Sequence, residues 1–492
     1  MTQALESQAS PSSWTFDGYE MVVGLEVHVE LATRTKLFSG SPNRFGDEPN
    51  TNIDPVTLGL PGALPVLNKH AVELAMRIGL ALNCTVQPCV FARKNYFYPD
   101  MPKAYQVSQY DQPLNVDGWL DLADGSRVGI ERAHMEEDAG KSVHAGGDGR
   151  VHGADYSLID LNRAGVPLVE IVSRPDIRSP EQAREYVGEL RAILLAIGAS
   201  DAKMEEGSMR VDANVSVRKP GEPYGTRCEI KNVNSIRSIV RAIEYEAKRQ
   251  IQMLQHGEQV RQQTRHWDEG DNRTHTLRDK EEADDYRYFL EPDLVPVAPS
   301  PEWIEEIRAG LPMLPAERRR RLSEIARVPA TSEAVTSIVE RGQDEYALAV
   351  VTAGGDPLRT VVHLKEAFAE LGPTPDLPAA DLAGLTRLEV GGTITATQVK
   401  SVLARMIQDG GGDPATIAAE MGFESMDTVA LEAIVDAAIE AQPDAWAKYL
   451  AGERKALGAI VGHVMKASKG QADGKLVNGI VEQRAAAAGS AT

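Results

Sequence analysis

Residues 23–30 read Val-Gly-Leu-Glu-Val-His-Val-Glu, and the alternation of apolar and polar side chains in this stretch is our starting point for the fold. Successive side chains of a β-strand point to opposite faces, so we predict a strand with one apolar face and one face bearing Glu26, His28 and Glu30. Carboxylate and imidazole groups placed together suit an enzyme that binds a hard cation or moves a proton. The alternative is an ordinary amphipathic strand with a solvated charged face.

Three further stretches repeat this pattern. Residues 209–217 place four polar side chains on one face: Arg210, Asp212, Asn214 and Ser216. Residues 227–231 bring together an acid and two bases: Arg227, Glu229 and Lys231. The less regular stretch 157–163 ends in an acid, an amide and a base: Asp160, Asn162 and Arg163. Several strands of this kind are hard to explain by solvent exposure alone, so we predict a polar catalytic cavity.

The segment 134–142, His-Met-Glu-Glu-Asp-Ala-Gly-Lys-Ser, ends like a P-loop. The first glycine of that motif would stand at position 135, which is Met, so we exclude a P-loop. The acids are instead predicted to complete an oxygen-rich metal site for which Mg²⁺ is the natural ion: Glu26, His28, Glu136 and Glu137. Lys141 is then left to meet a phosphate.

Composition indicates a soluble globular protein with two or three domains. The chain has 492 residues, of which 42% are hydrophobic and 25% charged. Its three cysteines supply neither a disulfide framework nor a zinc set, which favours a reducing cytoplasm. We find no secretory or transit signal and no apolar run long enough to span a membrane, so no membrane partner is expected.

The net charge of −20 argues against a generic nucleic-acid binder, and no DNA partner is expected. A specific RNA partner met by a local basic patch remains compatible with this charge. One candidate patch is the arginine run 318–321, and another consists of Lys466, Lys469 and Lys475. A solvated helix face is the ordinary alternative for such a cluster.

The order of segments predicts an α+β protein. After a flexible extension over residues 1–17, residues 18–295 are strand-rich and form a domain with a largely antiparallel sheet. Two helices are predicted in it, one opened by Ser179-Pro180 and one over residues 235–255. A proline-rich passage then leads to an all-helical domain over 296–412, and Gly410-Gly411-Gly412 precedes a small helical tail domain over 413–492.

Longer stretches carry a resemblance to a known family. They are GLEVHVEL (24–31), RKNYFYPD (93–100), HMEEDAGKS (134–142), DLNRAGVPLVEIVSRPDIRSP (160–180), KMEEGSMRVDANVSVR (203–218), EIKNVNS (229–235), DDYRYF (284–289) and VMKASKGQAD (464–473). In this order they closely resemble the B subunit of the bacterial aspartyl/glutamyl-tRNA amidotransferase. The resemblance covers almost the whole chain.

The resemblance implies a catalytic cradle domain, a helical domain and a tail domain that approaches tRNA. In this family ATP and ammonia convert glutamate misacylated on tRNA(Gln), and aspartate on tRNA(Asn), to the amides. The B subunit holds the tRNA and phosphorylates the side-chain carboxylate. A separate amidase subunit releases ammonia from glutamine, and a small third subunit holds the pair together. The expected assembly is therefore a heterotrimer.

Placed on matching positions, the resemblance gives each polar residue a role. Mg²⁺ is assigned to the four ligands already named. Lys141, Arg210 or Lys231 would meet phosphate oxygens, and Asn162 and Asn214 would orient the substrate carboxylate or ammonia. The catalytic set is completed by two acids, Asp212 and Glu229. The tRNA contact is expected from two lysines, Lys466 and Lys469.

The chain departs from the family pattern at a zinc site. Some members bind zinc through two cysteine pairs, but the equivalent positions here are Ser39, Ser41, Asp54 and Thr57, so no structural zinc is expected. Leu290 also stands where the family often has Pro.

Two other functions remain open. One is a non-catalytic tRNA-docking scaffold whose polar cavity only conducts ammonia. The strand face of acids and a histidine argues against it, because passing ammonia needs no metal ligands. The other is a self-sufficient amide ligase, but we find no Ser-Ser-Lys amidase stretch and no glutaminase cysteine. The choice between Glu-tRNA(Gln) and Asp-tRNA(Asn) is left open.

Overall fold

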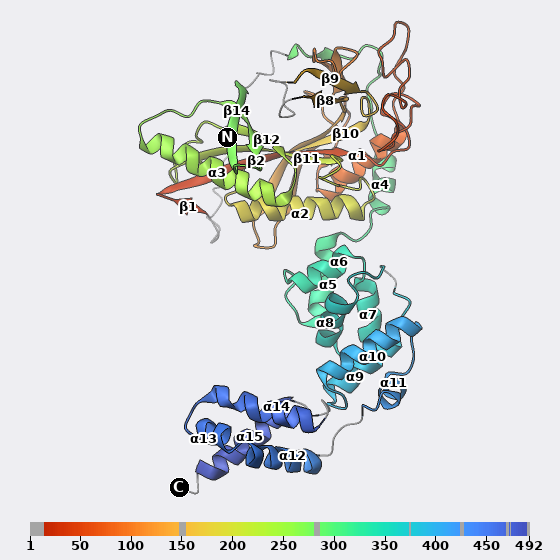
Figure 1. Ribbon diagram of the computed structural model, residues 1–492. Coiled ribbons are helices and arrows are strands. Elements are labelled where there is room, and N and C mark those ends of the chain that lie inside the picture. The colour runs from red at the N-terminus through yellow and green to blue at the C-terminus, as the bar shows by residue number, and fades with distance from the viewer. Residues whose placement is uncertain are drawn as a thin grey trace. The chain divides into compact units, whose positions relative to one another are not determined.

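The computed structural model describes residues 14–146, 154–279, 286–372, 375–423, 428–468, 472 and 474–489. The chain forms two compact units, Met1–Pro315 and Ala316–Thr492 (Figure 1). The first unit is built on a large sheet and the second on helices, which confirms the predicted α+β class. No helix of the described residues is long and apolar enough to cross a membrane.

The predicted strand over residues 23–30 lies inside β2 (Tyr19–Glu30), in the middle of the sheet. The strand order is β14-β13-β12-β11-β2-β10-β7-β5-β4-β15, and among the described strands only β12 and β13 pair in parallel. The bounds are β4 Ala92–Asn95, β5 Tyr105–Ser108, β7 Arg127–Glu137, β10 Pro167–Ser173, β11 Met209–Arg218, β12 Cys228–Val233, β13 Gln263–Asp268, β14 Arg273–Asp279 and β15 Phe289–Leu290.

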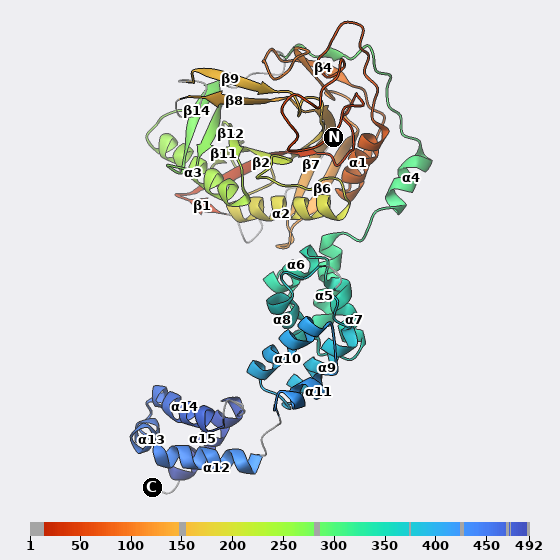
Figure 2. The same ribbon diagram turned by 45° about the vertical axis from the view of Figure 1, so that its right-hand side comes forward.

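Four further strands lie off this path, two of them in the same sheet and two in a separate one. β3 (Thr85–Val86) pairs with β6 (Asn115–Asp121), which pairs with β7. β8 (Lys141–Ala145) and β9 (Tyr156–Asp160) form a separate two-stranded ribbon. Figures 1 and 2 show this ribbon on the side of the sheet opposite helices α2 (Pro180–Ala196) and α3 (Ile236–Gln255).

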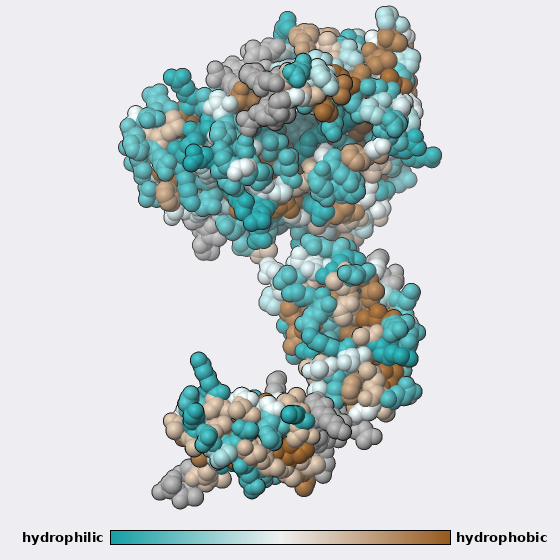
Figure 3. Space-filling model, in the orientation of Figure 1, coloured by the Kyte–Doolittle hydropathy of each residue, from teal (hydrophilic) through white to brown (hydrophobic). Residues whose placement is uncertain are grey.

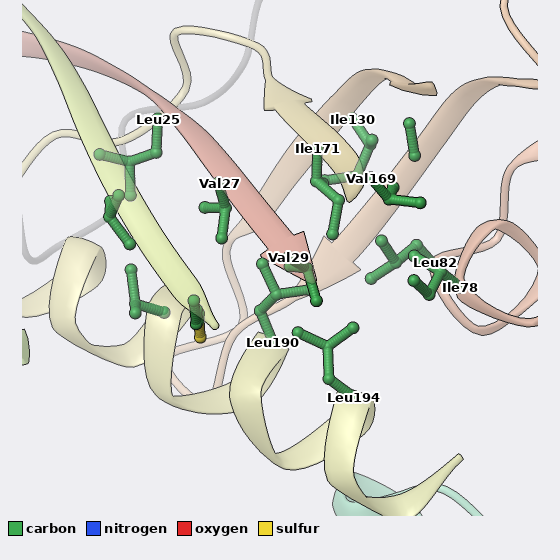
Figure 4. Packing of buried hydrophobic residues seen from close by; sticks show 14 of the residues in the cluster. Leu25, Val27, Val29, Ile78, Leu82, Ile130, Val169, Ile171, Leu190 and Leu194 are labelled. Atoms are coloured by element: carbon green, nitrogen blue, oxygen red, sulfur yellow. The ribbon is translucent and has the colours of Figure 1, made fainter. Parts of the chain in front are cut away.

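The apolar face of the sheet packs against helices. α1 (Lys69–Ala81), α2 (Pro180–Ala196) and α3 (Ile236–Gln255) contribute buried side chains to one core. Figure 4 shows Val29 of β2 beside Leu190 and Leu194 of α2. Burying one such side chain contributes about 1.5–3 kcal/mol, so this face fixes the register of β2.

The two predicted helices begin where their capping residues stand. The Ser179 side chain accepts a hydrogen bond from the backbone N–H of Gln182, and Pro180 occupies the first helical position. The Ser235 side chain accepts from the backbone N–H of Ser238. These bonds satisfy backbone donors that the helix itself leaves unpaired, which is why the sequence located both starts correctly.

The predicted N-terminal extension was wrong at its inner end. Residues 1–13 lie outside the described residues, but β1 (Thr15–Phe16) pairs with β2, Thr15 lying opposite Glu20. Asp17 and Gly18, both with positive φ, form the turn between the two strands. An Asp-Gly pair suits such a two-residue hairpin turn, so this signal was present in the sequence.

The second unit contains two hydrophobic clusters. One involves α5 to α11 and includes Leu322, Val361, Leu385 and Val402. The other involves α12, α14 and α15 and includes Val435, Ile460 and Val477. The bounds are α5 Pro315–Ala326, α6 Glu333–Glu340, α7 Asp344–Thr352, α8 Pro357–Ala367, α9 Ala379–Val390, α10 Ala396–Asp409, α11 Pro414–Glu420, α12 Thr428–Ala441, α13 Pro443–Leu450, α14 Leu457–Ala467 and α15 Gly474–Gly489.

Packing places the limits of these parts later than the expected residues 295 and 412. α4 (Pro301–Ala309) belongs to the first unit, because Ile307 is buried in its core and the Lys69 ammonium lies 5.4 Å from the Trp303 ring centroid. Beyond the glycines, Ile417 and Ala418 of α11 are buried in the first cluster of the second unit. Proline and glycine mark the turns here but not the ends of the cores.

Candidate functional site

The sheet of the first unit carries a polar face on the side away from α2 and α3. We define the polar face by side chains of β2, β7, β10, β11 and β12, which are Glu26, His28, Glu30, His134, Glu136, Glu170, Arg210, Asp212, Asn214, Glu229 and Lys231. Figure 3 shows this unit hollowed, and the walls visible in the hollow are mainly hydrophilic. The predicted polar cavity therefore corresponds to one face of one sheet.

Strand register decides which polar side chains meet. His28 lies opposite Glu170 of β10 on one side and opposite Arg210 of β11 on the other. Glu26, two residues earlier, lies opposite Val172 and Asp212. Residues on one strand face are about 6.6 Å apart along the strand, so Glu26 and His28 have different neighbours.

His28, Glu136 and Glu170 form the first cluster. The His28 Nε2 atom is 3.8 Å from a carboxylate oxygen of Glu136 and 3.8 Å from one of Glu170. One ligand atom from each residue lies within 4.8 Å of the others, a spacing that suits one divalent cation. Two carboxylates and an imidazole fit Mg²⁺ with further sites left for water or substrate.

Glu170 is kept as a carboxylate by its surroundings. Its Oε2 atom lies 3.2 Å from Nε2 of His134. Burial raises the pKa of a carboxyl group, but the hydrogen bond and charge of His134, with the charge of His28, hold the pKa of Glu170 well below its usual value. A lowered pKa favours the ionised carboxylate, which is the form that binds a metal ion.

Sequence reasoning missed Glu170 as a candidate ligand. It lies in the apolar stretch Pro-Leu-Val-Glu-Ile-Val, where it is the only charged residue. A lone acid in a buried strand is a signal for a paired or ligating carboxylate, because an unpaired buried charge is costly. Its partners come from other strands, so pairing could not be seen from local spacing.

Glu26 belongs to a second cluster with Asp212 and Glu229, again with ligand atoms within 4.8 Å. The Lys231 Nζ atom lies 2.7 Å from Asp212 and 3.0 Å from Glu229. Burial lowers the pKa of Lys231, but the two carboxylates outweigh burial and raise it above the usual value. Asn214 Nδ2 donates to Glu26 Oε1 at 2.8 Å. The single predicted metal site is therefore corrected to two neighbouring clusters.

Glu137 does not join either cluster. Its carboxylate accepts hydrogen bonds from the Lys103 ammonium and from the backbone N–H of Val107 at 2.8 Å. Adjacent residues of a strand point to opposite faces, so Glu136 and Glu137 cannot both reach the ion. The prediction of Glu137 as a metal ligand was wrong.

Arg210 lies on the polar face, between two acids. Its guanidinium is 2.7 Å from Asp138 and 3.4 Å from Glu30. Burial and repulsion from Asp138 raise the pKa of Glu30 to about 8. Arg210 thus compensates one buried and one half-buried carboxyl group next to the first cluster.

Lys141 and Asn162 lie outside both clusters. Lys141 begins the β8–β9 ribbon opposite Asp160, and its side chain is exposed. The Asn162 side chain accepts from the backbone N–H of Asn52 at 2.8 Å and donates to the Glu48 carbonyl at 2.7 Å. Asn162 therefore holds a loop in place, which is a structural use of its amide.

The four positions that replace zinc-binding cysteines still lie together. Asp54 accepts a hydrogen bond from the backbone N–H of Thr57 at 2.8 Å. Burial raises the pKa of Asp54, but hydrogen bonds from Thr57, Ser39 and Ser41 outweigh it and lower the pKa. A hydrogen-bonded carboxylate thus ties these four positions together.

The two basic patches differ in their surroundings. Arg318 makes a bidentate ion pair with Asp344, and Arg321 pairs with Glu345, as expected for a structural helix face. Lys466 is exposed in the last turn of α14. Lys469 lies outside the described residues.

Comparison with known proteins first defines the class. Residues 21–305 match the GatB/GatE catalytic domain, and residues 335–484 match the GatB domain. A relative from Nocardia farcinica is 50% identical over 94% of this chain and 95% of its own length, and one from Salinispora tropica is 49% identical over 95% and 96%. Both are named as the B subunit of aspartyl/glutamyl-tRNA(Asn/Gln) amidotransferase. This chain belongs to that family.

Proposed function

We propose that this chain is the tRNA-binding kinase subunit of an ATP-dependent amidotransferase. It phosphorylates the side-chain carboxylate of Glu-tRNA(Gln), Asp-tRNA(Asn) or both, and amidates it with ammonia to give Gln-tRNA(Gln) or Asn-tRNA(Asn). The names of the relatives support the substrate class. The cluster of His28, Glu136 and Glu170 on the polar face is the observation that carries the proposal.

Phosphorylation solves a chemical problem. A carboxylate is a poor acyl electrophile because its leaving group would be oxide. When a carboxylate oxygen attacks the γ-phosphorus, an O–P bond forms and the bond to ADP breaks. Ammonia then forms the C–N bond, inorganic phosphate leaves with the C–O electron pair, and the nitrogen loses a proton.

The polar face supplies what these steps need. His28, Glu136 and Glu170 would hold Mg²⁺, which when bound neutralises charge on phosphate oxygens. Lys231 and Arg210 are fixed cations held by their acid partners. Because these groups are already in place, they stabilise developing charge without reorganising during the reaction.

We assign the remaining functions to partners. The sequence has no Ser-Ser-Lys amidase stretch, so we assign the release of ammonia to a separate amidase subunit. A small third subunit would complete the complex. The tail domain contacts tRNA phosphates through Lys466 and Lys469. No zinc takes part.

The test is amidation of each misacylated tRNA by the purified chain with ATP, Mg²⁺ and a high concentration of ammonium salt. We expect Gln-tRNA(Gln) or Asn-tRNA(Asn) together with ADP. With glutamine as the only nitrogen donor, product should form only after the amidase subunit is added. If the complete complex made amide without consuming ATP, the kinase assignment would fail, and a chain that bound tRNA but never turned over would support the scaffold alternative.

A further inference from the structure

The side of the sheet that carries the polar face continues from β12 onto β13. The two strands are joined through α3, and such a helical crossover is what allows neighbouring strands to pair in parallel. In this pairing Thr264 of β13 lies opposite Glu229 of β12. Side chains at paired positions of neighbouring strands point to the same side of a sheet, so the Thr264 hydroxyl lies beside the Glu229 carboxylate.

The next residues of β13 agree with this placement. Arg265 points to the helix side, where its Nε atom lies 3.4 Å from a carboxylate oxygen of Glu246 in α3. Trp267, two residues further on, is buried in the core that α3 covers. Because adjacent residues of a strand point to opposite faces, Thr264 belongs to the polar side.

Glu229 uses its two oxygen atoms for two different partners. The Thr264 hydroxyl donates a hydrogen bond to Oε2 at 3.0 Å, and the Lys231 ammonium lies 3.0 Å from Oε1. The same ammonium donates to Asp212 Oδ2 at 2.7 Å. These contacts form a chain that runs from Thr264 through Glu229 to Lys231 and Asp212.

The chain is buried at its inner end, where Thr264 is 1% exposed and Glu229 6%. A buried carboxylate oxygen strongly prefers a hydrogen-bond donor, so the hydroxyl fixes the orientation of the carboxylate. Without this donor the carboxylate could rotate, and rotation would move Oε1 away from Lys231. Valine suits a strand as well as threonine does, so the hydroxyl serves Glu229 rather than the strand.

We propose that Thr264 is a positioning residue that fixes Glu229 and, through it, the Lys231 ammonium for the phosphoryl step. The inference rests on the proposed function, in which Lys231 stabilises charge on phosphate oxygens. It adds a buried residue on which the reaction depends without any contact to the reactants. A lysine ammonium sits on a flexible four-carbon stem, so its partners must hold it where charge develops.

Thr264→Val tests the proposal in the full-length chain assembled with its partner subunits, because valine keeps the shape of the side chain and removes the hydroxyl. We expect kcat for amidation at saturating ammonium to fall by roughly tenfold to a hundredfold, as is typical when a reacting or supporting group is misplaced. The KM for aminoacyl-tRNA should stay constant. Thr264→Ser keeps the hydroxyl and should retain most of the rate.

Thr274→Val is the matched control in β14. Thr274 is 3% exposed, and its hydroxyl donates to Glu246 Oε2 at 2.7 Å on the helix side of the sheet. This variant loses an equivalent buried hydrogen bond to a carboxylate. Its thermal midpoint should therefore fall about as much as that of Thr264→Val, whereas its kcat should match the wild type.

Equal losses of kcat in Thr264→Val and Thr274→Val would indicate a general effect of lost stability and overturn the proposal. An unchanged kcat in Thr264→Val, or a Thr264→Ser variant no more active than Thr264→Val, would overturn it as well. A wild-type complex that makes amide without consuming ATP would instead defeat the proposed function. That result is seen in the wild type alone, so the two failures are distinguishable.

Discussion

Among single residues, His134 and Glu170 illustrate how one side chain prepares another. Neither is a strong candidate from local spacing, yet His134 lies 3.2 Å from Glu170 and helps to lower the pKa of that carboxyl group next to His28. Substituting a partner that orients a metal ligand in this way typically weakens metal binding by roughly 10–100-fold.

Glu170→Gln should remove a ligand of the first cluster without changing its shape. We expect Mn²⁺ binding, followed by electron paramagnetic resonance, to weaken by at least about a hundredfold, with parallel loss of ATP turnover. His134→Ala should weaken binding by roughly 10–100-fold. Glu131→Gln changes an exposed acid of β7 and is the control. Normal Mn²⁺ affinity in Glu170→Gln would contradict the assignment of this cluster.

Lys36 is a buried lysine outside the proposed chemistry, 1% exposed, whose Nζ donates to the Leu161 carbonyl at 3.4 Å. Burial lowers its pKa from 10.5 to about 8, against the opposing charges of Asp54 and Glu137. Between these two pH values the unfolded chain binds a proton that the folded chain does not. The free energy of unfolding therefore decreases as pH falls from 10.5 to about 8, and the loss is complete below 8.

Lys36→Met should remove this pH dependence. At about pH 7 we expect the free energy of unfolding of the variant to exceed that of the wild type by up to roughly 3 kcal/mol, less the contribution of any lost contacts. At about pH 10 the advantage should shrink, because the wild-type penalty is then mostly absent. Urea unfolding at both pH values measures the difference, and a constant or inverted difference would show that burial does not shift Lys36.

Among the elements, α1 and the β6–β7 pair are joined through Asn115. Its amide donates to the Ala75 carbonyl at 3.1 Å and to the Ala133 carbonyl at 2.9 Å, so one side chain links the helix to β7. Gly79 makes room for it, because a Cβ there would lie 2.0 Å from Asn115 Oδ1.

Gly79→Ala should therefore destabilise the first unit by about 1–3 kcal/mol through forced movement of a buried side chain. Gly188→Ala is the matched control in α2, where a Cβ would meet nothing within 4 Å. That substitution should stabilise by roughly 0.5–1 kcal/mol, because alanine restricts the unfolded chain. Thermal unfolding distinguishes the two variants. Equal effects would mean that the Asn115 side chain moves aside at little cost in stability.

In the molecule as a whole, core clusters define units better than linker composition does. The glycines at 410–412 mark a break in the helices, but Ile417 and Ala418 beyond them are part of the preceding core. Phe423 also packs on that cluster. A cut at the glycines would thus open a core, whereas a cut after Phe423 would not.

The chain 1–423 should keep the wild-type unfolding midpoint of this cluster, and the chain 1–412 should lower it. On the proposed function, removing the tail should also weaken tRNA binding and flatten its dependence on salt, because phosphate contacts release counterions. Fluorescence anisotropy at several salt concentrations measures the slope, with Lys466→Gln expected to reduce it by about one unit. If the chain 1–423 and the full chain had the same tRNA affinity and the same salt dependence, the tail would not contact tRNA.

Local sequence was enough to predict the α+β class, the strand in β2, the starts of α2 and α3, and the polar character of one sheet face. Alternation and capping depend on neighbours along the chain, so they can be recognised without the fold. The same sequence also carried the motifs that place the chain in its family.

Which acids share a cluster could not be predicted in this way. Glu26 and His28 lie on the same face of β2, yet strand register places Glu26 opposite Asp212 and His28 opposite Glu170. The Glu137 carboxylate accepts a hydrogen bond from Lys103, and the Asn162 amide donates one to a backbone carbonyl of a loop. Register arises from burying the opposite, apolar face of the sheet against α2 and α3. The partners of a polar side chain are therefore fixed by core packing that its own sequence segment does not contain.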